Sequence, residues 1–132
     1  MDDLTPKISD FGFKSLKENA SIFLKYKNKN AYSSPELLKD KKTIGNSFAQ
    51  LDYHTDVYSF GMLLWELYTM TIPFNVKMKT IYNMVAIEDF RPEITKDFNH
   101  YIANIIRCCW DVEISKRPNF TKIGELLINV KI

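Results

Sequence analysis

A carboxylate and a glycine lie close to the start of the chain, in the sequence Asp10-Phe11-Gly12. They follow a short stretch, Lys7–Ser9, that is predicted to be a strand. A carboxylate at a strand end, beside a flexible glycine, can hold a metal ion against the phosphates of a nucleotide. Three common residues in a row also occur in ordinary turns, so the residues further along the chain decide between the two interpretations.

Other motifs follow this triplet along the chain. They are Ser34-Pro35-Glu36, the run from Asp56 to Gly61, Cys109-Trp110, and Arg117-Pro118-Asn119-Phe120. In this order and spacing the chain resembles the C-terminal part of a protein kinase domain, from its Asp-Phe-Gly motif to its last helix. Ser34-Pro35-Glu36 stands where that family has Ala-Pro-Glu. Cys-Trp followed by Arg-Pro-x-Phe is typical of tyrosine kinases and of the tyrosine-kinase-like group of serine/threonine kinases, and we expect the latter group.

The resemblance implies a role for each residue of the first motif. Asp10 matches the family aspartate that ligates the magnesium ion bridging the phosphates of ATP. Phe11 matches the aromatic residue that packs beneath it and differs between active and inactive arrangements. Gly12 permits the backbone flip between those arrangements. ATP and Mg2+ are therefore the expected cofactors of the complete domain.

By the same resemblance, residues 10–36 correspond to the activation segment and residues 37–132 to the helical C-lobe. The hydroxyl groups considered as phosphorylation sites belong to Ser15, Ser21, Tyr26 and Tyr32. For each of them, an unmodified surface hydroxyl is the simpler interpretation. Lys29 stands where serine/threonine kinases usually have threonine, and Ala31 stands where tyrosine kinases usually have lysine. Neither pattern fits fully, and the missing lysine favours serine/threonine specificity.

Several residues are implied to support the site without reacting. Glu36 and Arg117 match the partners of a partly buried ion pair, and removing one partner of such a pair costs about 3–5 kcal/mol. Asp56 matches an aspartate that bonds the backbone of the catalytic loop. Leu63 and Leu67 match positions that support the column of side chains reaching the adenine. The structural set is completed by Ser34, Pro35 and Trp110.

A long helix over His54–Met70 is expected to position these groups. Its apolar residues recur at intervals of three and four, and more apolar residues lie on its other faces, which predicts a helix that is buried nearly all round. The repeating residues are Val57, Phe60, Leu63, Leu64 and Leu67. Thr55 or Asp56 can cap the first turn, and Pro73 prevents the helix from continuing.

Further helices are predicted around this one. A short helix begins at Pro35, a loop covers residues 39–50, and another helix covers Met78–Ile87. Two amphipathic helices complete the chain, one with Ile102, Ile105, Ile106 and Cys109 and ending at Trp110, the other with Phe120, Ile123, Leu126 and Leu127. We expect a mainly α, partial protein kinase-like fold: a helical C-lobe organised around a buried central helix, with a short β remnant at the N-terminus.

The composition fits a single globular domain. The chain has 132 residues, of which 45% are hydrophobic, and a formal net charge of only +2. This charge gives no argument for binding to nucleic acid or to a membrane surface. Adjacent cysteines at Cys108 and Cys109 disfavour a structural disulfide, and no secretory signal opens the chain, so we expect a soluble, cytoplasmic protein. His54 and His100 have no metal-ligand spacing around them.

Catalytic parts of a kinase precede Asp-Phe-Gly and are not in this sequence. They are the glycine-rich loop, the strand lysine, the helix glutamate and the His-Arg-Asp loop with its asparagine. No catalytic residue is therefore assigned, and we expect a truncated kinase domain that is inactive and binds no cofactor as an isolated chain. Its expected partners are a protein substrate or a regulatory protein. The alternatives are a pseudokinase-like binding module, which uses the groove between the 78–87 helix and the central helix, and a decayed remnant.

Overall fold

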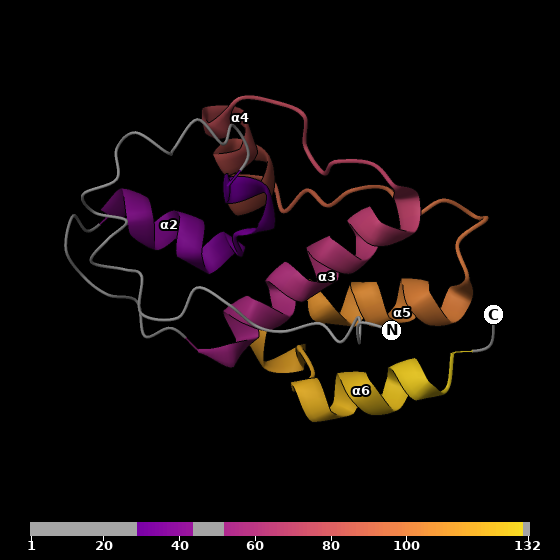
Figure 1. Cartoon of the computed structure of the whole chain (residues 1–132). Helices are drawn as coiled ribbons and strands as arrows, with labels where there is room; N and C mark the ends of the chain where they lie inside the picture. Colours follow the sequence, from indigo (N-terminus) through magenta and orange to yellow (C-terminus); the bar gives the residue numbers. More distant parts are fainter. Residues whose placement is uncertain (1–28, 44–51, 131–132) are drawn as a thin grey trace, which may run out of the picture.

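The computed structural model describes residues 29–43 and 52–130 (Figure 1). The described elements, in chain order, are η1 (Lys29–Tyr32), α2 (Pro35–Thr43), α3 (Tyr53–Thr69), α4 (Met78–Tyr82), η2 (Asn83–Ile87), α5 (His100–Cys109), η3 (Ile114–Lys116) and α6 (Phe120–Ile128). No strand occurs within these ranges, and the expectation of a mainly helical fold is confirmed. The expected strand at 7–9, and with it the β remnant, lies outside the described residues.

Helix α3 is the central element of the fold. In Figure 1 it runs through the middle of the molecule, with α2 and α4 on one side and α5 and α6 on the other. One cluster of buried side chains joins α3 to η1, α2, α4 and η2, and a second joins α3 to α5 and α6. The buried residues of α3 are Thr55, Val57, Tyr58, Gly61, Met62 and Trp65. The helix therefore supplies side chains to both clusters.

Both ends of α3 lie one residue before the expected ends at His54 and Met70. Helix α3 begins at Tyr53, with Asp52 in the N-cap position, so the prediction of Thr55 or Asp56 as the cap is wrong. The reason is that Thr55 bonds back to the carbonyl oxygen of Asp52, through its amide at 3.0 Å and its hydroxyl at 2.8 Å. The last helical residue is Thr69, and Met70 follows in a left-handed conformation with φ of 53°.

Helix α3 packs into both buried clusters but leaves one face exposed, which corrects the prediction of a helix buried nearly all round. Leu63 is 44% exposed, Leu67 is 62% exposed and Met70 is 87% exposed. Leu63 and Leu67 are four residues apart and share one helical face, and Met70 lies just beyond the end of the helix. The pattern shows which residues are hydrophobic, but it does not show which faces of the helix pack against another element. The face that carries these residues is called the open face of α3 below.

Helices α3 and α5 approach each other closely at Gly61. A Cβ atom added at Gly61 would lie 2.7 Å from the Cβ of Cys109, a distance that side chains do not tolerate. Cys109 is fully buried at this crossing. The glycine therefore sets how close the two helices can pack, because any larger residue would push them apart.

The remaining helices largely follow the sequence. The helix over 78–87 is present, but its last part, η2, is a π-helix in which the Glu88 amide bonds the Asn83 carbonyl at 3.0 Å. Helix α5 ends at Cys109, next to Trp110. Helix α2 continues to Thr43, so the predicted loop from residue 39 begins too early, because the residues after Pro35 are mostly good helix formers. Within the described residues, no helix is long and apolar enough to cross a membrane.

Candidate functional site

The motif Ser34-Pro35-Glu36 lies where η1 passes into α2. The Leu38 amide bonds the carbonyl oxygen of Ser34 at 3.1 Å, so Ser34 precedes the first helical turn. Pro35 is the first residue of α2, a position where its fixed φ suits a helix and its missing N–H costs nothing. Glu36 is in the first turn, where the helix dipole favours a carboxylate. The local sequence thus places Glu36 in the first turn of a helix.

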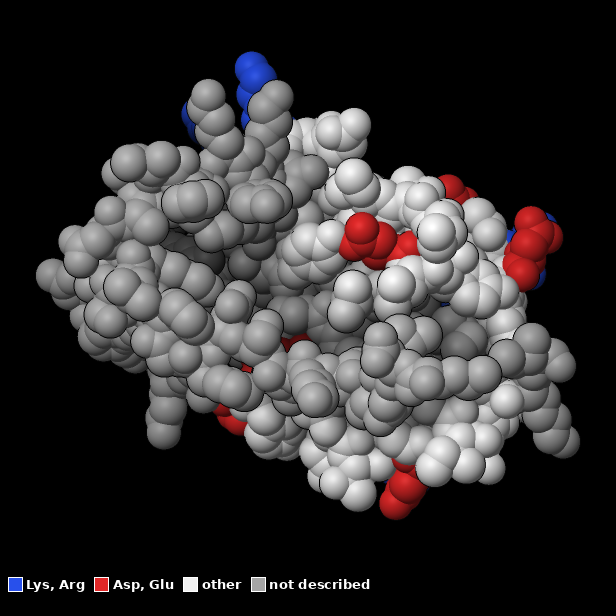
Figure 2. All heavy atoms as spheres, in the orientation of Figure 1, with Lys and Arg blue, Asp and Glu red and all other residues white. Residues whose placement is uncertain are grey.

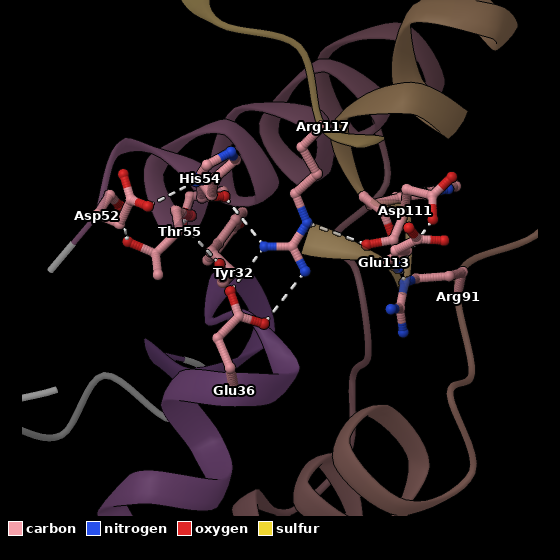
Figure 3. Close-up of polar contacts among 11 residues, drawn as sticks. Tyr32, Glu36, Asp52, His54, Thr55, Arg91, Asp111, Glu113 and Arg117 are labelled. Atoms are coloured by element: carbon pink, nitrogen blue, oxygen red, sulfur yellow. Dashed lines mark hydrogen bonds and ion pairs between the residues drawn. The ribbon is translucent and has the colours of Figure 1, made fainter. Parts of the chain in front are cut away.

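Glu36 forms a two-point ion pair with Arg117, which follows η3 (Figure 3). Arg117 Nη1 donates to Glu36 Oε1 at 2.6 Å, and Nη2 donates to Oε2 at 3.1 Å. Nη1 also donates to the carbonyl of His54 at 3.1 Å, and Nε donates to the carbonyl of Asp111 at 3.0 Å. One guanidinium group therefore holds together α2, the start of α3 and the segment that leads into η3.

Burial makes this pair sensitive to the loss of either partner. The Arg117 side chain is 0% exposed and that of Glu36 is 27% exposed. Burial is the largest single effect and raises the pKa of Glu36, but the hydrogen bonds that Glu36 accepts, with those from Arg117 foremost, and the charge of Arg117 together hold that pKa below its ordinary value. Glu36 is therefore ionised at neutral pH. A bidentate, charged contact of this kind also fixes the relative orientation of its two segments.

Tyr58 extends the site under the ion pair. Its ring lies beneath two guanidinium groups, with the central carbon of Arg117 at 5.2 Å and that of Arg91 at 5.1 Å from the ring centroid. Burial raises the pKa of Tyr58 to about 12. Arg91 Nε donates to the carbonyl of Trp110 at 3.1 Å. Trp110, 6% exposed, is thus tied to the cluster through its backbone.

Sequence reasoning missed the part that Arg91 plays. Arg91-Pro92 comes shortly after the helix predicted over 78–87, and nothing in its spacing indicated a partner at Trp110. Tyr58 was noted only as part of a motif. The closeness of Arg91 to a second arginine in space is recognised only when the chain is folded.

A second polar contact joins η1 to α3. The Tyr32 hydroxyl donates to a carboxylate oxygen of Glu66, and Ser59 Oγ donates to the Tyr32 carbonyl at 2.8 Å. Burial and the neighbouring Glu66 raise the pKa of Tyr32 to about 12. Glu66 carried no expected role. Ala31, next to Tyr32, is fully buried in the core.

The other residues singled out from the sequence divide into two groups. Asp56 is exposed, and Leu63 and Leu67 lie on the open face of α3. The positions that fall outside the described residues are Asp10, Phe11, Gly12, Ser15, Ser21 and Tyr26. Within the part of the chain that is described, no three His, Cys, Asp or Glu residues come together as metal ligands. The described residues of the site therefore hold segments of the chain together, and they include no catalytic centre.

Charged side chains form no second cluster on the described part of the face seen in Figure 2. On the side of the molecule seen in Figure 2, the described atoms are mainly uncharged, with scattered acidic side chains. Exposed pairs such as Lys116–Glu113 and Lys122–Glu125 join neighbouring residues within one turn. Such surface pairs contribute little to stability. The buried Glu36–Arg117 pair remains the main polar feature of the described molecule.

The fold and this site define a mainly helical unit in which a buried ion pair holds a Ser-Pro-Glu segment against a central helix. A family model, described as protein tyrosine and serine/threonine kinase, matches residues 1–127. The chain belongs to this family of protein kinases. The family model covers both tyrosine kinases and serine/threonine kinases, and the Cys-Trp and Arg-Pro-x-Phe motifs also resemble both groups.

Individual kinases resemble almost the whole chain. Dual specificity protein kinase shkD of Dictyostelium discoideum is 31% identical over 98% of this chain and 17% of the relative. Serine/threonine-protein kinase CTR1 of Arabidopsis thaliana is 38% identical over 93% of this chain and 14% of the relative. Probable serine/threonine-protein kinase roco8 of Dictyostelium discoideum is 30% identical over 98% of this chain and 7% of the relative. The chain thus spans less than a fifth of each of these proteins.

Proposed function

We propose that this chain is the activation segment and helical C-lobe of an ATP-dependent kinase that phosphorylates serine or threonine in protein substrates. The observation that carries the proposal is the Glu36–Arg117 pair, which ties the end of segment 10–36 to the helical core. A kinase needs this segment held in place, because it lies beside the protein substrate. Family membership and the two relatives named as serine/threonine kinases support the proposal.

The cofactors are assigned through the resemblance of the first motif. Asp10 is the proposed magnesium ligand, Phe11 and Gly12 its neighbours in the Asp-Phe-Gly motif, and ATP with Mg2+ the cofactors of the complete domain. Magnesium bound there would neutralise phosphate charge that opposes transfer. No further step is assigned to Asp10, which lies outside the described residues. The free state of Cys108 and Cys109 supports a cytoplasmic location for the protein.

The isolated 132 residues are proposed to be inactive. One magnesium ligand, without the strand lysine or the His-Arg-Asp base, does not position a nucleotide for transfer. The test is a radiolabelled phosphate-transfer assay of the purified chain beside its Asp10→Ala variant. We expect no transfer from either chain. Transfer by the parent chain that is lost in Asp10→Ala would overturn the proposed inactivity.

The kinase assignment has a separate test in the coding sequence. An in-frame His-Arg-Asp motif upstream of Met1 would support an active kinase, and its following residues would decide between serine/threonine and tyrosine specificity. In a protein that contains that motif, Asp10→Ala should abolish transfer while leaving the melting temperature unchanged. Stop codons that close the upstream frame would contradict the assignment of catalytic activity.

A non-catalytic binding module is the second candidate function. The open face of α3 favours it, because Leu63, Leu67 and Met70 expose apolar surface. A chain that stays monodisperse in sedimentation, melts cooperatively and binds one defined protein would support this candidate. Non-cooperative melting would instead support a decayed remnant.

A further inference from the structure

Arg91 carries a positive charge that no carboxylate pairs with in the described structure. Its Nε donates to the carbonyl of Trp110 at 3.1 Å, and its Nη1 donates to the carbonyl of Phe90 at 2.9 Å. The Nη2 atom is buried and has no hydrogen-bond partner among the described residues. Within residues 29–43 and 52–130, no ion pair joins Arg91 to an Asp or Glu side chain. A buried donor on a charged group is costly to leave unpaired, so this atom marks a place for a ligand.

The hydroxyl group of Tyr58 is a second buried polar group without a partner in the described part of the chain. Tyr58 is 0% exposed, and the central carbon of Arg91 lies 5.1 Å from the centroid of its ring. Burial raises the pKa of Tyr58 to about 12, and Arg91 opposes that rise more than any other charged group does. The hydroxyl therefore keeps its proton at neutral pH and lies close to the Arg91 charge.

The donors and the charges around them select the class of ligand. Arg91 Nη2 can only donate, and a protonated phenol donates through its one hydrogen, so the ligand must accept from both. The charge favours an anion, because the central carbon of Arg117 lies 5.2 Å from the same ring and Glu36 is already engaged by Arg117 at two points. Asp89 also acts on the pKa of Tyr58, but Asp89 is exposed. Water would accept both bonds but would leave the charge of Arg91 unbalanced.

We propose that Arg91 Nη2 and the hydroxyl group of Tyr58 bind a small monovalent anion of the size of chloride. Both atoms are buried, which favours a single small ion over a polyatomic anion. The anion balances the Arg91 charge beside the Glu36–Arg117 pair, and its binding stabilises the folded chain. This inference goes beyond the proposed function and does not depend on phosphate transfer by this chain.

The test measures the melting temperature of the full 132-residue chain while sodium chloride replaces sodium gluconate at constant ionic strength. Constant ionic strength keeps the screening of surface charges unchanged, and gluconate is too large for a site between buried atoms. A ligand that binds only the folded chain stabilises it in proportion to the logarithm of its concentration. We therefore expect a tenfold increase in chloride, above the dissociation constant, to raise Tm by about 5 °C.

Variants of the two donors test whether they form the site. Tyr58→Phe keeps the ring and removes only the hydroxyl, so it should weaken chloride binding about tenfold. Arg91→Gln removes the charge and should abolish the chloride dependence of Tm. The matched control is Arg107→Gln, which changes an exposed arginine of α5 and should leave the dependence as it is in the parent chain.

Line broadening of the chloride NMR signal is a second measurement, which decides alone if melting is not cooperative. The broadening should be largest with the parent chain, smaller with Tyr58→Phe and smallest with Arg91→Gln. The absence of any chloride effect on the parent chain would mean that water satisfies the two donors, and it would overturn the proposal. Equal chloride binding by the parent chain and by either donor variant would overturn it as well.

Discussion

The start and the middle of α3 are held in the fold by different kinds of contact. At the start, Arg117 bonds the Glu36 carboxylate and the carbonyl of His54. In the middle, Gly61 has no side chain, and α5 packs against its backbone at Cys109. The first contact depends on charge and direction, whereas the second depends on volume. The comparison teaches that one helix can be anchored by a specific polar group at one end and by the absence of a side chain further along.

Removing the guanidinium should have the largest effect. Arg117→Ala leaves the Glu36 carboxylate half-buried without its partner and strips a hydrogen bond from His54. We expect a loss of about 3–5 kcal/mol in the free energy of unfolding, measured by urea denaturation. Arg107→Ala is the matched control, because Arg107 is exposed on α5 and should change stability by less than about 0.5 kcal/mol. Equal effects of the two variants would show that the polar anchor contributes nothing.

Filling the contact in the middle should have the next largest effect. Gly61→Ala places a methyl group 2.7 Å from the Cβ of Cys109, so α3 and α5 must separate. We expect a loss of about 1–3 kcal/mol, again by urea denaturation. Gly124→Ala is the control, since nothing lies within 4 Å of the added atom in α6. It should raise stability by about 0.5–1 kcal/mol, because alanine favours helix. A Gly61→Ala protein that is as stable as the parent chain would contradict the close contact between α3 and α5.

Acid and alkali should weaken the two regions separately. Arg117 holds the pKa of Glu36 below its ordinary value, so its contribution to stability is present above about pH 4.5 and is lost as pH falls through the lowered pKa. Burial raises the pKa of Cys109 to about 12, so its contribution is lost as pH rises from about 9 through 12.

Urea denaturation at a series of pH values measures both the loss of stability in acid and the loss in alkali. The acid loss should be smaller in Arg117→Ala, because the pKa of Glu36 then returns toward its ordinary value. The alkaline loss should be smaller in Cys109→Ala, where no thiol titrates, although Tyr58, with its pKa raised to about 12, still contributes. An acid dependence unchanged by Arg117→Ala would contradict the role of the ion pair.

The smallest effect is expected on the open face of α3. Leu67 is 62% exposed, so Leu67→Gln removes little buried apolar area and should change stability by less than about 0.5 kcal/mol. Met62→Gln is the contrasting variant, since Met62 is 0% exposed on the packed side of the same helix. Thermal melting that shows a large loss for Leu67→Gln would mean that this face is covered in solution.

Periodicity predicted the helices well where each has one apolar face. Helices α5 and α6 lie where their repeats of apolar residues indicated, and α2 begins at Pro35. Periodicity also located α3, but it did not show which face of α3 is exposed, because apolar residues around the whole helix do not indicate which face meets a neighbour. The cap residue was also wrong, because Thr55 bonds the Asp52 carbonyl and therefore lies inside the first turn of the helix.

The sequence by itself determined the helical fold class and, through its motifs, the kinase family to which the chain belongs. These depend on local spacing and on residue types that can be read in order. Only the tertiary structure decided that Arg91 and Arg117 share the ring of Tyr58, that Tyr32 bonds Glu66, and which face of α3 is open. The physical reason is that these contacts join residues that are distant in sequence, 34 apart for Tyr32 and Glu66, and such pairings depend on how helices pack in space.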